Sequence, residues 1–106
     1  MNADPATIYS EALAAAKTAV AACGPEDTRS FNCGFAWVTI RPARGPFVSY
    51  CKRNRIGNKH WHSGWWIENP GLFGGQQVDH KLAGARAFAD VLSAHGLDAS
   101  VGSRLD

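Results

Sequence analysis

The sequence predicts an α+β fold (or a small α/β fold) in which one three-stranded sheet packs against helices. Helical and strand periodicities alternate along the chain in the order α-β-α-β-α-β, which is typical of a single sheet covered by helices. The length of 106 residues supports one domain, residues 1–106, and leaves no room for a second core. A domain of this size can bury roughly 60–70% of its unfolded surface, so it needs neither a metal nor disulfides to fold.

The first helix is predicted over residues 5–23. Asp4 is a suitable N-cap, and Pro5 suits the first helical position. Apolar residues recur at helical spacing as far as Cys23, and Gly24-Pro25 ends the run. Because most of this apolar stripe is alanine, we expect the helix to approach its neighbour closely while burying little area per residue.

Two further helices are expected, each followed by a glycine that would end it. The second helix begins at Pro46 and should end with Gly57 as its C-terminal cap. The third helix opens at Val78-Asp79 with Asp79 as its N-cap, and Gly96 stops it.

Strands are predicted at residues 35–41, 61–67 and 98–105 from their aromatic, β-branched or alternating composition. Successive side chains of a strand face opposite sides of the sheet, so each strand splits into two sets. The sets assigned to the helices are Ala36, Val38 and Ile40, then Ala99, Val101 and Leu105, and, because Ile67 lies with them, Trp61, Ser63, Trp65 and Ile67. The opposite, open face would then carry Phe35, Trp37, Arg41, His62, Trp66 and Arg104. A slip of one residue in the strand at 61–67 would exchange its two sets.

Positive charge is concentrated in one segment of the chain. The net charge is only +2, yet residues 28–67 contain seven Lys and Arg side chains and no Asp or Glu. This segregation favours an anionic partner. Within the segment, CKRNRIGNKHWHSGWW (residues 51–66) combines four cations, two histidines and three tryptophans, which could contact phosphates and stack on bases. The residues predicted to bind a nucleic acid or another anion are Arg41, Arg44, Lys52, Arg53, Arg55, Lys59, His62, Trp66, Trp37 and Arg104.

Each part of this segment also has a purely structural explanation. Cations in the last turn of a helix offset the negative end of its dipole. Tryptophans commonly form the core of a small domain, so several of Trp37, Trp61, Trp65 and Trp66 could be buried. If another layer covered the open face of the sheet, no aromatic platform would exist.

Motifs for catalysis or metal binding are weak. His60 and His62 share one strand face and are weak candidates for metal ligands, but no third ligand lies at a diagnostic spacing. Cys33 or Cys51 could pair with His62 or His80, yet no nucleophile motif surrounds either cysteine. We therefore expect no cofactor and no enzymatic activity.

The cysteine pattern and the N-terminal residues bear on where the protein works. Three cysteines without paired spacing are typical of free thiols in a reducing compartment. The sequence shows no export signal and no apolar run long enough to span a bilayer. These features predict a cytoplasmic protein that does not bind membranes.

Two segments of the sequence look familiar: NCGFAWVTIRPARGPF (residues 32–47) and AGARAFADVLSAHGLDASVGSRLD (residues 83–106). Together with the strand between them, they resemble a set of small uncharacterised proteins of tailed bacteriophages. The resemblance covers roughly the last two-thirds of the chain and supplies no catalytic motif. It implies an accessory product in the host bacterial cytoplasm that binds host proteins or nucleic acids.

The combined expectation is a small non-enzymatic accessory protein whose basic and aromatic surface engages an anionic partner, with nucleic acid favoured. One alternative is an inhibitor that binds an acidic host or defence protein through the same surface. Another is a metal-dependent enzyme that uses His60 and His62. Self-association through the exposed aromatic face, giving a homodimer, is a further expectation because exposed aromatic patches often mark interfaces.

Overall fold

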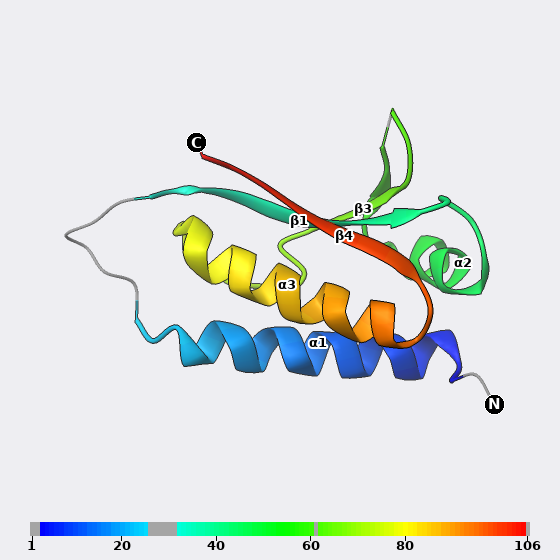
Figure 1. Ribbon diagram of the computed structural model, residues 1–106, viewed down its shortest axis with the longest axis horizontal. Coiled ribbons are helices and arrows are strands. Elements are labelled where there is room, and N and C mark those ends of the chain that lie inside the picture. Colours follow the sequence, from blue (N-terminus) through cyan, green and yellow to red (C-terminus); the bar gives the residue numbers. More distant parts are fainter. Residues whose placement is uncertain (1–2, 26–31, 61, 106) are drawn as a thin grey trace.

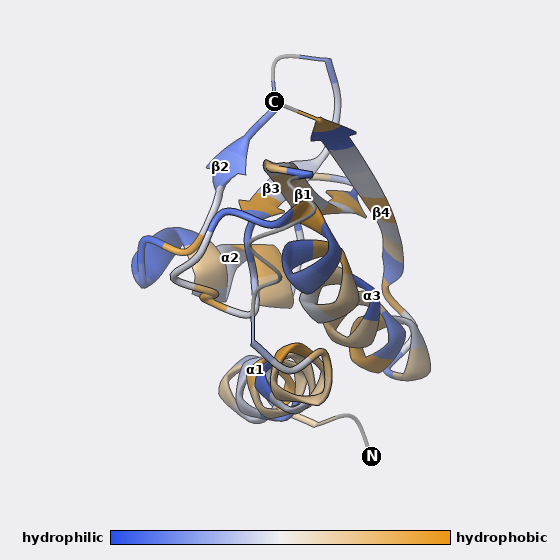
Figure 2. Cartoon of the chain, turned by 90° about the vertical axis from the view of Figure 1, so that its left-hand side faces the viewer, coloured by the Kyte–Doolittle hydropathy of each residue, from blue (hydrophilic) through white to orange (hydrophobic). Residues whose placement is uncertain are grey.

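The computed structural model describes residues 3–25, 32–60 and 62–105 and arranges them in three layers. A four-stranded antiparallel sheet forms one layer, α2 and α3 lie beneath it, and α1 lies beneath those helices (Figure 1, Figure 2). The elements are α1 (Pro5–Ala22), β1 (Gly34–Arg41), α2 (Pro46–Arg53), β2 (Asn58–Lys59), β3 (Trp65–Glu68), α3 (Val78–Ala94) and β4 (Asp98–Leu105). The predicted α+β class is confirmed, and so are the bounds of the last strand. The predicted count of three strands and the strict helix–strand alternation are wrong.

The strand expected at residues 61–67 is shortened to β3, and the extra strand, β2, is formed by residues 58–59 ahead of it. The strands follow the order β2-β3-β1-β4, so β2 pairs with β3 at one edge of the sheet. Gly64 has φ 86°, and an ideal Cβ there would lie 2.8 Å from Thr39 Cγ2. Only glycine fits this close, left-handed turn. The β2–β3 hairpin therefore projects from the open side of the sheet, away from the helices (Figure 1).

The predicted N-cap residue is confirmed for α1 and wrong for α3. Asp4 caps α1 as expected, since its carboxylate accepts a hydrogen bond from the Thr7 backbone N–H at 2.9 Å. These bonds to Thr7 hold the pKa of the Asp4 carboxyl below its usual value. In α3 the N-cap position belongs to Gln77, and Asp79 lies within the first turn, so the predicted Asp79 cap is wrong. The predicted start at Val78 is confirmed, and the backbone N–H of buried Val78 donates to the Asn32 carbonyl, ahead of β1.

The two later helices end on the same motif with different residues. Gly96, with φ 85°, ends α3 as predicted. In α2 the left-handed residue is Arg55, with φ 57°, and Ile56 N–H donates to the Cys51 carbonyl at 2.9 Å. The predicted Gly57 cap is therefore wrong. Gly57 instead lets the chain pass close to β3, because a Cβ there would lie 2.7 Å from the Trp65 indole nitrogen.

One apolar cluster fills the space between the sheet and the helices, and α1 joins it through small side chains. Ala12 and Ala16 of α1 are fully buried. An ideal Cβ on Gly84 of α3 would lie 3.0 Å from Val20 Cγ2, and one on Gly71 would lie 3.5 Å from Ala16 Cβ. The expected close approach of an alanine-rich helix is thus confirmed.

We predict that Ala16→Leu destabilises the protein by about 1–3 kcal/mol, because the added atoms have no space between α1 and the rest of the core. Ala14→Leu on the exposed side of the same helix is the matched control and should change stability by less than about 0.5 kcal/mol. Urea unfolding followed by circular dichroism measures both. Equal effects of the two substitutions would contradict this close packing.

Candidate functional site

The alternation of β1 produces the open face that the sequence predicted. Ala36, Val38 and Ile40 are buried against the helices, whereas Phe35 and Trp37 are partly exposed on the other side. The assignment of faces on β1 is therefore confirmed.

The ambiguous tryptophans of β3 take the sides that were assigned to them. Trp65 is only 6% exposed and its indole N–H donates to the Ile56 carbonyl at 2.9 Å, so it belongs to the core. Trp66 points to the open face and is partly exposed. Trp61, which was expected beside Trp65, lies outside the described residues.

Aromatic rings on the open face form a continuous stack, here called the ring stack: Trp37, Trp66 and His60. The Trp37 and Trp66 rings lie 4.6 Å apart at 12°, and the Trp66 and His60 rings lie 3.9 Å apart at 5°. Trp37 pairs with Glu68 in the register of β1 and β3, which makes Trp66 its diagonal neighbour. The His62 ring follows at 5.9 Å from His60.

The ring stack rests on a glycine of the neighbouring strand. Gly102 of β4 is the register partner of Trp37, and an ideal Cβ on Gly102 would lie 2.6 Å from Trp37 Cε2 and Nε1. The indole therefore occupies the space that any larger residue at position 102 would need. No role was predicted for Gly102 from the sequence. A glycine in mid-strand opposite a tryptophan was the available signal.

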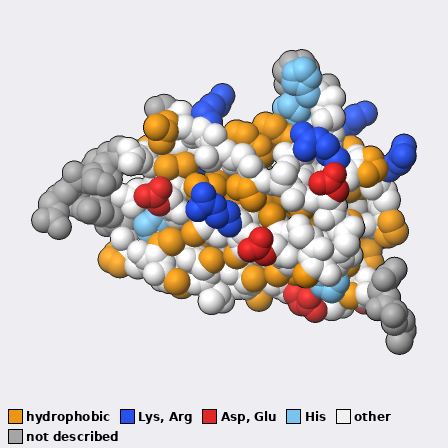
Figure 3. Space-filling model, in the orientation of Figure 1, with side chains coloured by type: hydrophobic (Ala, Val, Ile, Leu, Met, Phe, Trp, Pro, Cys, Tyr) orange, Lys and Arg blue, Asp and Glu red, His pale blue; other side chains and the backbone are white. Residues whose placement is uncertain are grey.

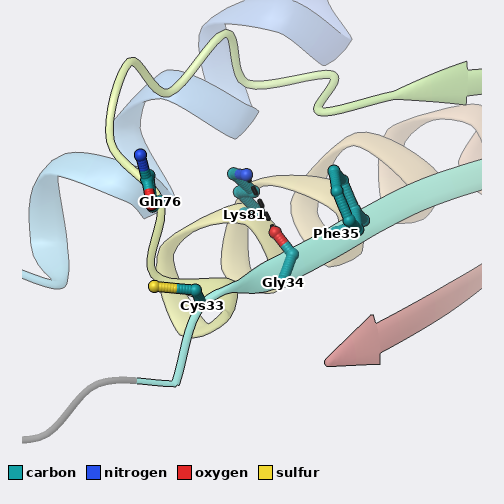
Figure 4. Close-up of a pocket in the computed structure, with 5 residues that line it drawn as sticks. All are labelled: Cys33, Gly34, Phe35, Gln76 and Lys81. Carbon is teal, nitrogen blue, oxygen red and sulfur yellow. Dashed lines mark hydrogen bonds between the residues drawn. The ribbon is translucent and has the colours of Figure 1, made fainter. Parts of the chain in front are cut away.

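Phe35 lies at the other end of β1, between two cations. Lys81 Nζ is 5.2 Å from the ring centroid and the Arg104 guanidinium carbon is 5.4 Å away, both within range of a cation–π contact. Lys81 also donates to the Gly34 carbonyl at 2.8 Å (Figure 4). Phe35, Lys81 and Gly34, with Cys33 and Gln76, line a cavity of about 270 Å³. Sequence reasoning missed Lys81, because only the packing of α3 on β1 brings it to this end of the sheet.

Arg41 spans the opposite end of the open face. Its Nε donates to Ser63 Oγ at 3.1 Å and its Nη1 to Ser100 Oγ at 3.4 Å, which links the hairpin to β4 across β1. Hydroxyl partners orient the guanidinium without neutralising its charge. The fold also brings two acids to this face: Glu68 is the register partner of Trp37, and Asp98 is that of Arg41. The open face is therefore less strongly basic than the acid-free segment suggested.

The remaining predicted cations gather elsewhere and are here called the α2-end cations: Lys52, Arg53, Arg55 and Lys59. Lys52 Nζ is 5.7 Å from the ring centroid of buried Trp65, and Lys59 is the register partner of Trp65. Both side chains thus lie on the helix side of the sheet, at its β2 edge. Trp37 and Trp66 lie on the opposite face of the sheet from these two side chains. Arg44 lies in the turn between β1 and α2, and like the α2-end cations it is exposed.

The groups considered for metal or thiol chemistry do not converge. Among residues 3–25, 32–60 and 62–105, no three His, Cys, Asp or Glu side chains cluster in a way that could hold a metal ion. His60 Nδ1 accepts a hydrogen bond from the His62 backbone N–H at 3.2 Å. Cys51 is fully buried, and burial raises the pKa of its thiol to about 12. His80 Nε2 lies 2.8 Å from the Gly24 carbonyl oxygen.

Comparisons with known proteins found no matching family model, no matching curated protein and no matching solved structure. The resemblance to phage proteins therefore stays a prediction. None of the described helices combines the length and the apolar character that a bilayer crossing requires.

We predict that Gly102→Ala destabilises the protein by about 1–3 kcal/mol, because the new methyl group displaces Trp37 and with it the ring stack. Gly74→Ala is the matched control: it has open space around it and no left-handed φ, so its effect should stay within about 0.5 kcal/mol. Urea unfolding measures stability, and near-ultraviolet circular dichroism reports on the stacked indoles. An unchanged aromatic signal in Gly102→Ala would show that Trp37 does not rest on Gly102.

Proposed function

We propose that this protein is a non-enzymatic nucleic-acid-binding protein that takes a single strand across the open face of its sheet. The observation that carries the proposal is the arrangement of aromatic rings and cations on that face. Phe35, Trp37 and Trp66 are partly exposed there, and Arg41 and Arg104 flank them. Aromatic side chains beside cations are the combination that binds single strands without reading sequence.

The ring stack itself limits how bases can bind. The faces of Trp66 are occupied by Trp37 and His60, and one side of Trp37 is turned to Gly102. Bases would therefore contact the exposed ring edges or lie beside Phe35, where the cations Lys81 and Arg104 would attract the electron-rich face of a base. Arg41 and Arg104 would contact the phosphates between these points.

The α2-end cations would extend this path beyond the sheet edge. They follow each other within eight residues of sequence, all are exposed, and residues 28–67 hold no acid. Two of them, Lys52 and Arg53, lie in the last turn of α2 and also offset the helix dipole. A phosphate chain leaving the open face over the β2–β3 hairpin would meet Lys59 first and the others next.

The alternatives differ in what supports them. A protein-binding inhibitor of phage origin would use the same exposed rings and remains the second candidate. The metal-dependent enzyme has no support from the described residues, since a third ligand near His60 and His62 is lacking among them.

We expect short single-stranded DNA and RNA to bind with an affinity that falls steeply with salt. Each phosphate contact to a single strand contributes about −0.7 to the slope of log K against log salt concentration. The variant Lys52→Gln/Arg53→Gln/Arg55→Gln/Lys59→Gln should therefore lower the magnitude of the slope by up to about 3. Fluorescence anisotropy of a labelled oligonucleotide, titrated at several salt concentrations, measures this.

The matched control compares Arg53→Gln with Lys17→Gln, which removes an exposed charge from α1, the layer farthest from the sheet. Lys17→Gln should leave affinity and salt slope unchanged. No binding at low salt, or equal losses in the two single variants, would overturn the proposal. A nuclease-resistant, stoichiometric protein partner in that case would favour the inhibitor.

A further inference from the structure

β4 is an edge strand that the rest of the described chain leaves open. It runs for eight residues, pairs along its whole length with β1, and stands last in the sheet order. None of the described residues pairs with its outer side. Such an edge presents a row of backbone donors and acceptors that can pair with another strand.

We propose that β4 pairs with β4 of a second copy of this chain, in antiparallel orientation and centred on Val101. The sequence of the strand is self-complementary in this register. Asp98 lies opposite the partner's Arg104, and Arg104 lies opposite the partner's Asp98. Positions 98 and 104 share one face of the strand, so these opposite charges meet directly across the new ladder.

The same register covers an exposed apolar side chain. Leu105 is 65% exposed at the end of β4, although large apolar residues are usually buried. A two-fold axis at Val101 brings Leu105 opposite the partner's Leu97, which is packed against the edge of the core. A register centred on Gly102 would instead place Arg104 opposite a serine. The Val101 register is thus the one that matches both charge and apolar character.

The position of α3 beneath β4 gives a distance between the two α3 helices that is compatible with this dimer. α3 packs against both β1 and β4, so its axis runs below the gap between these strands. With strands about 4.8 Å apart, that axis lies about 5 Å from the two-fold axis, and the two α3 helices lie about 10 Å from each other. Packed helices are separated by about 8–10 Å. The continuous sheet therefore brings the helices into contact without a clash.

The outward side of α3 is also self-complementary around the same axis. Val101 lies about 13 Å along β4 from Leu97, and a helix covers that distance in about nine residues. Because α3 leads into Leu97, the part of α3 beneath Val101 lies about nine residues before Leu97. That part falls between Arg86 and Asp90, which are both exposed. Antiparallel α3 helices would therefore place Arg86 near the partner's Asp90, twice. Figure 3 shows this side of the molecule, where acidic and basic side chains are scattered among hydrophobic groups.

The dimer would have one eight-stranded sheet with both ring stacks on the same side. A two-fold axis perpendicular to the sheet keeps the helices of both copies below it and the two open faces above it. This interface uses the β4 edge and α3 and leaves the ring stack uncovered, and its ion pairs are formed by Asp98 and Arg104 at the border of the open face. The inference therefore stands independently of nucleic-acid binding.

Sedimentation equilibrium of the full chain, without nucleic acid, tests the dimer. We expect twice the monomer mass of 11.4 kDa. Arg104→Asp places two aspartates opposite Asp98 residues and should weaken dimerisation about tenfold or more, and Asp98→Arg should do the same. The double variant Asp98→Arg/Arg104→Asp restores opposite charges across the axis and should restore the dimer. Arg53→Asp, at the far end of α2, is the matched control and should leave the mass unchanged.

Circular dichroism checks that each variant is folded. Arg104 also contacts Phe35, so the exposed pair on α3 supplies an independent test with Arg86→Asp, Asp90→Arg and their combination. Wild-type protein that stays monomeric up to about 1 mM would overturn the proposal. So would single reversals that leave the dimer intact, or double variants that fail to restore it.

Discussion

The contact between the Trp37 indole and Gly102 organises the open side of this sheet. Because position 102 has no side chain, the indole can lie over the β4 backbone, and Trp66 and His60 can stack behind it. The stack thereby joins β4, β1 and the β2–β3 hairpin on the face of the sheet opposite the described helices. Arg41 adds a second link across the same strands through two serine hydroxyls. The hairpin, which has only two residues in β2, depends on these side-chain contacts for its position.

The fold also decides which charges can act together. Along the sequence the cations and tryptophans look like one motif. The alternation of β3 places Trp65 in the core, where Lys52 lies over its ring, and places Trp66 on the opposite face of the sheet. The α2-end cations consequently lie around the sheet edge from the ring stack. Two acids from outside the basic segment, Glu68 and Asp98, join the open face through strand pairing. Such neighbours depend on register, so a linear reading of charge could not place them.

Local signals were sufficient for much of the fold. The bounds of β4, the cap at Asp4 and the faces of β1 follow from alternation and helix chemistry, and the structure agrees. Tertiary contacts decide the rest. Gly64 makes a left-handed turn against Thr39, so the expected strand starts only at Trp65 and pairs with residues 58–59 as a hairpin. Gly57 is needed where the chain passes β3, so the left-handed end of α2 falls to Arg55. Neither of these close contacts can be recognised from the sequence, because each depends on how the strands pair.

The most direct test of the proposed role is to observe the indole N–H resonances by NMR while single-stranded DNA is added. The N–H signals of Trp37 and Trp66 should shift in proportion to binding, because both rings lie on the open face. The signal of Trp65 should stay in place, since its N–H is bonded to the Ile56 carbonyl within the core. Binding that shifts only Trp65, or that leaves Trp37 and Trp66 unchanged, would contradict the assignment of the open face as the binding surface.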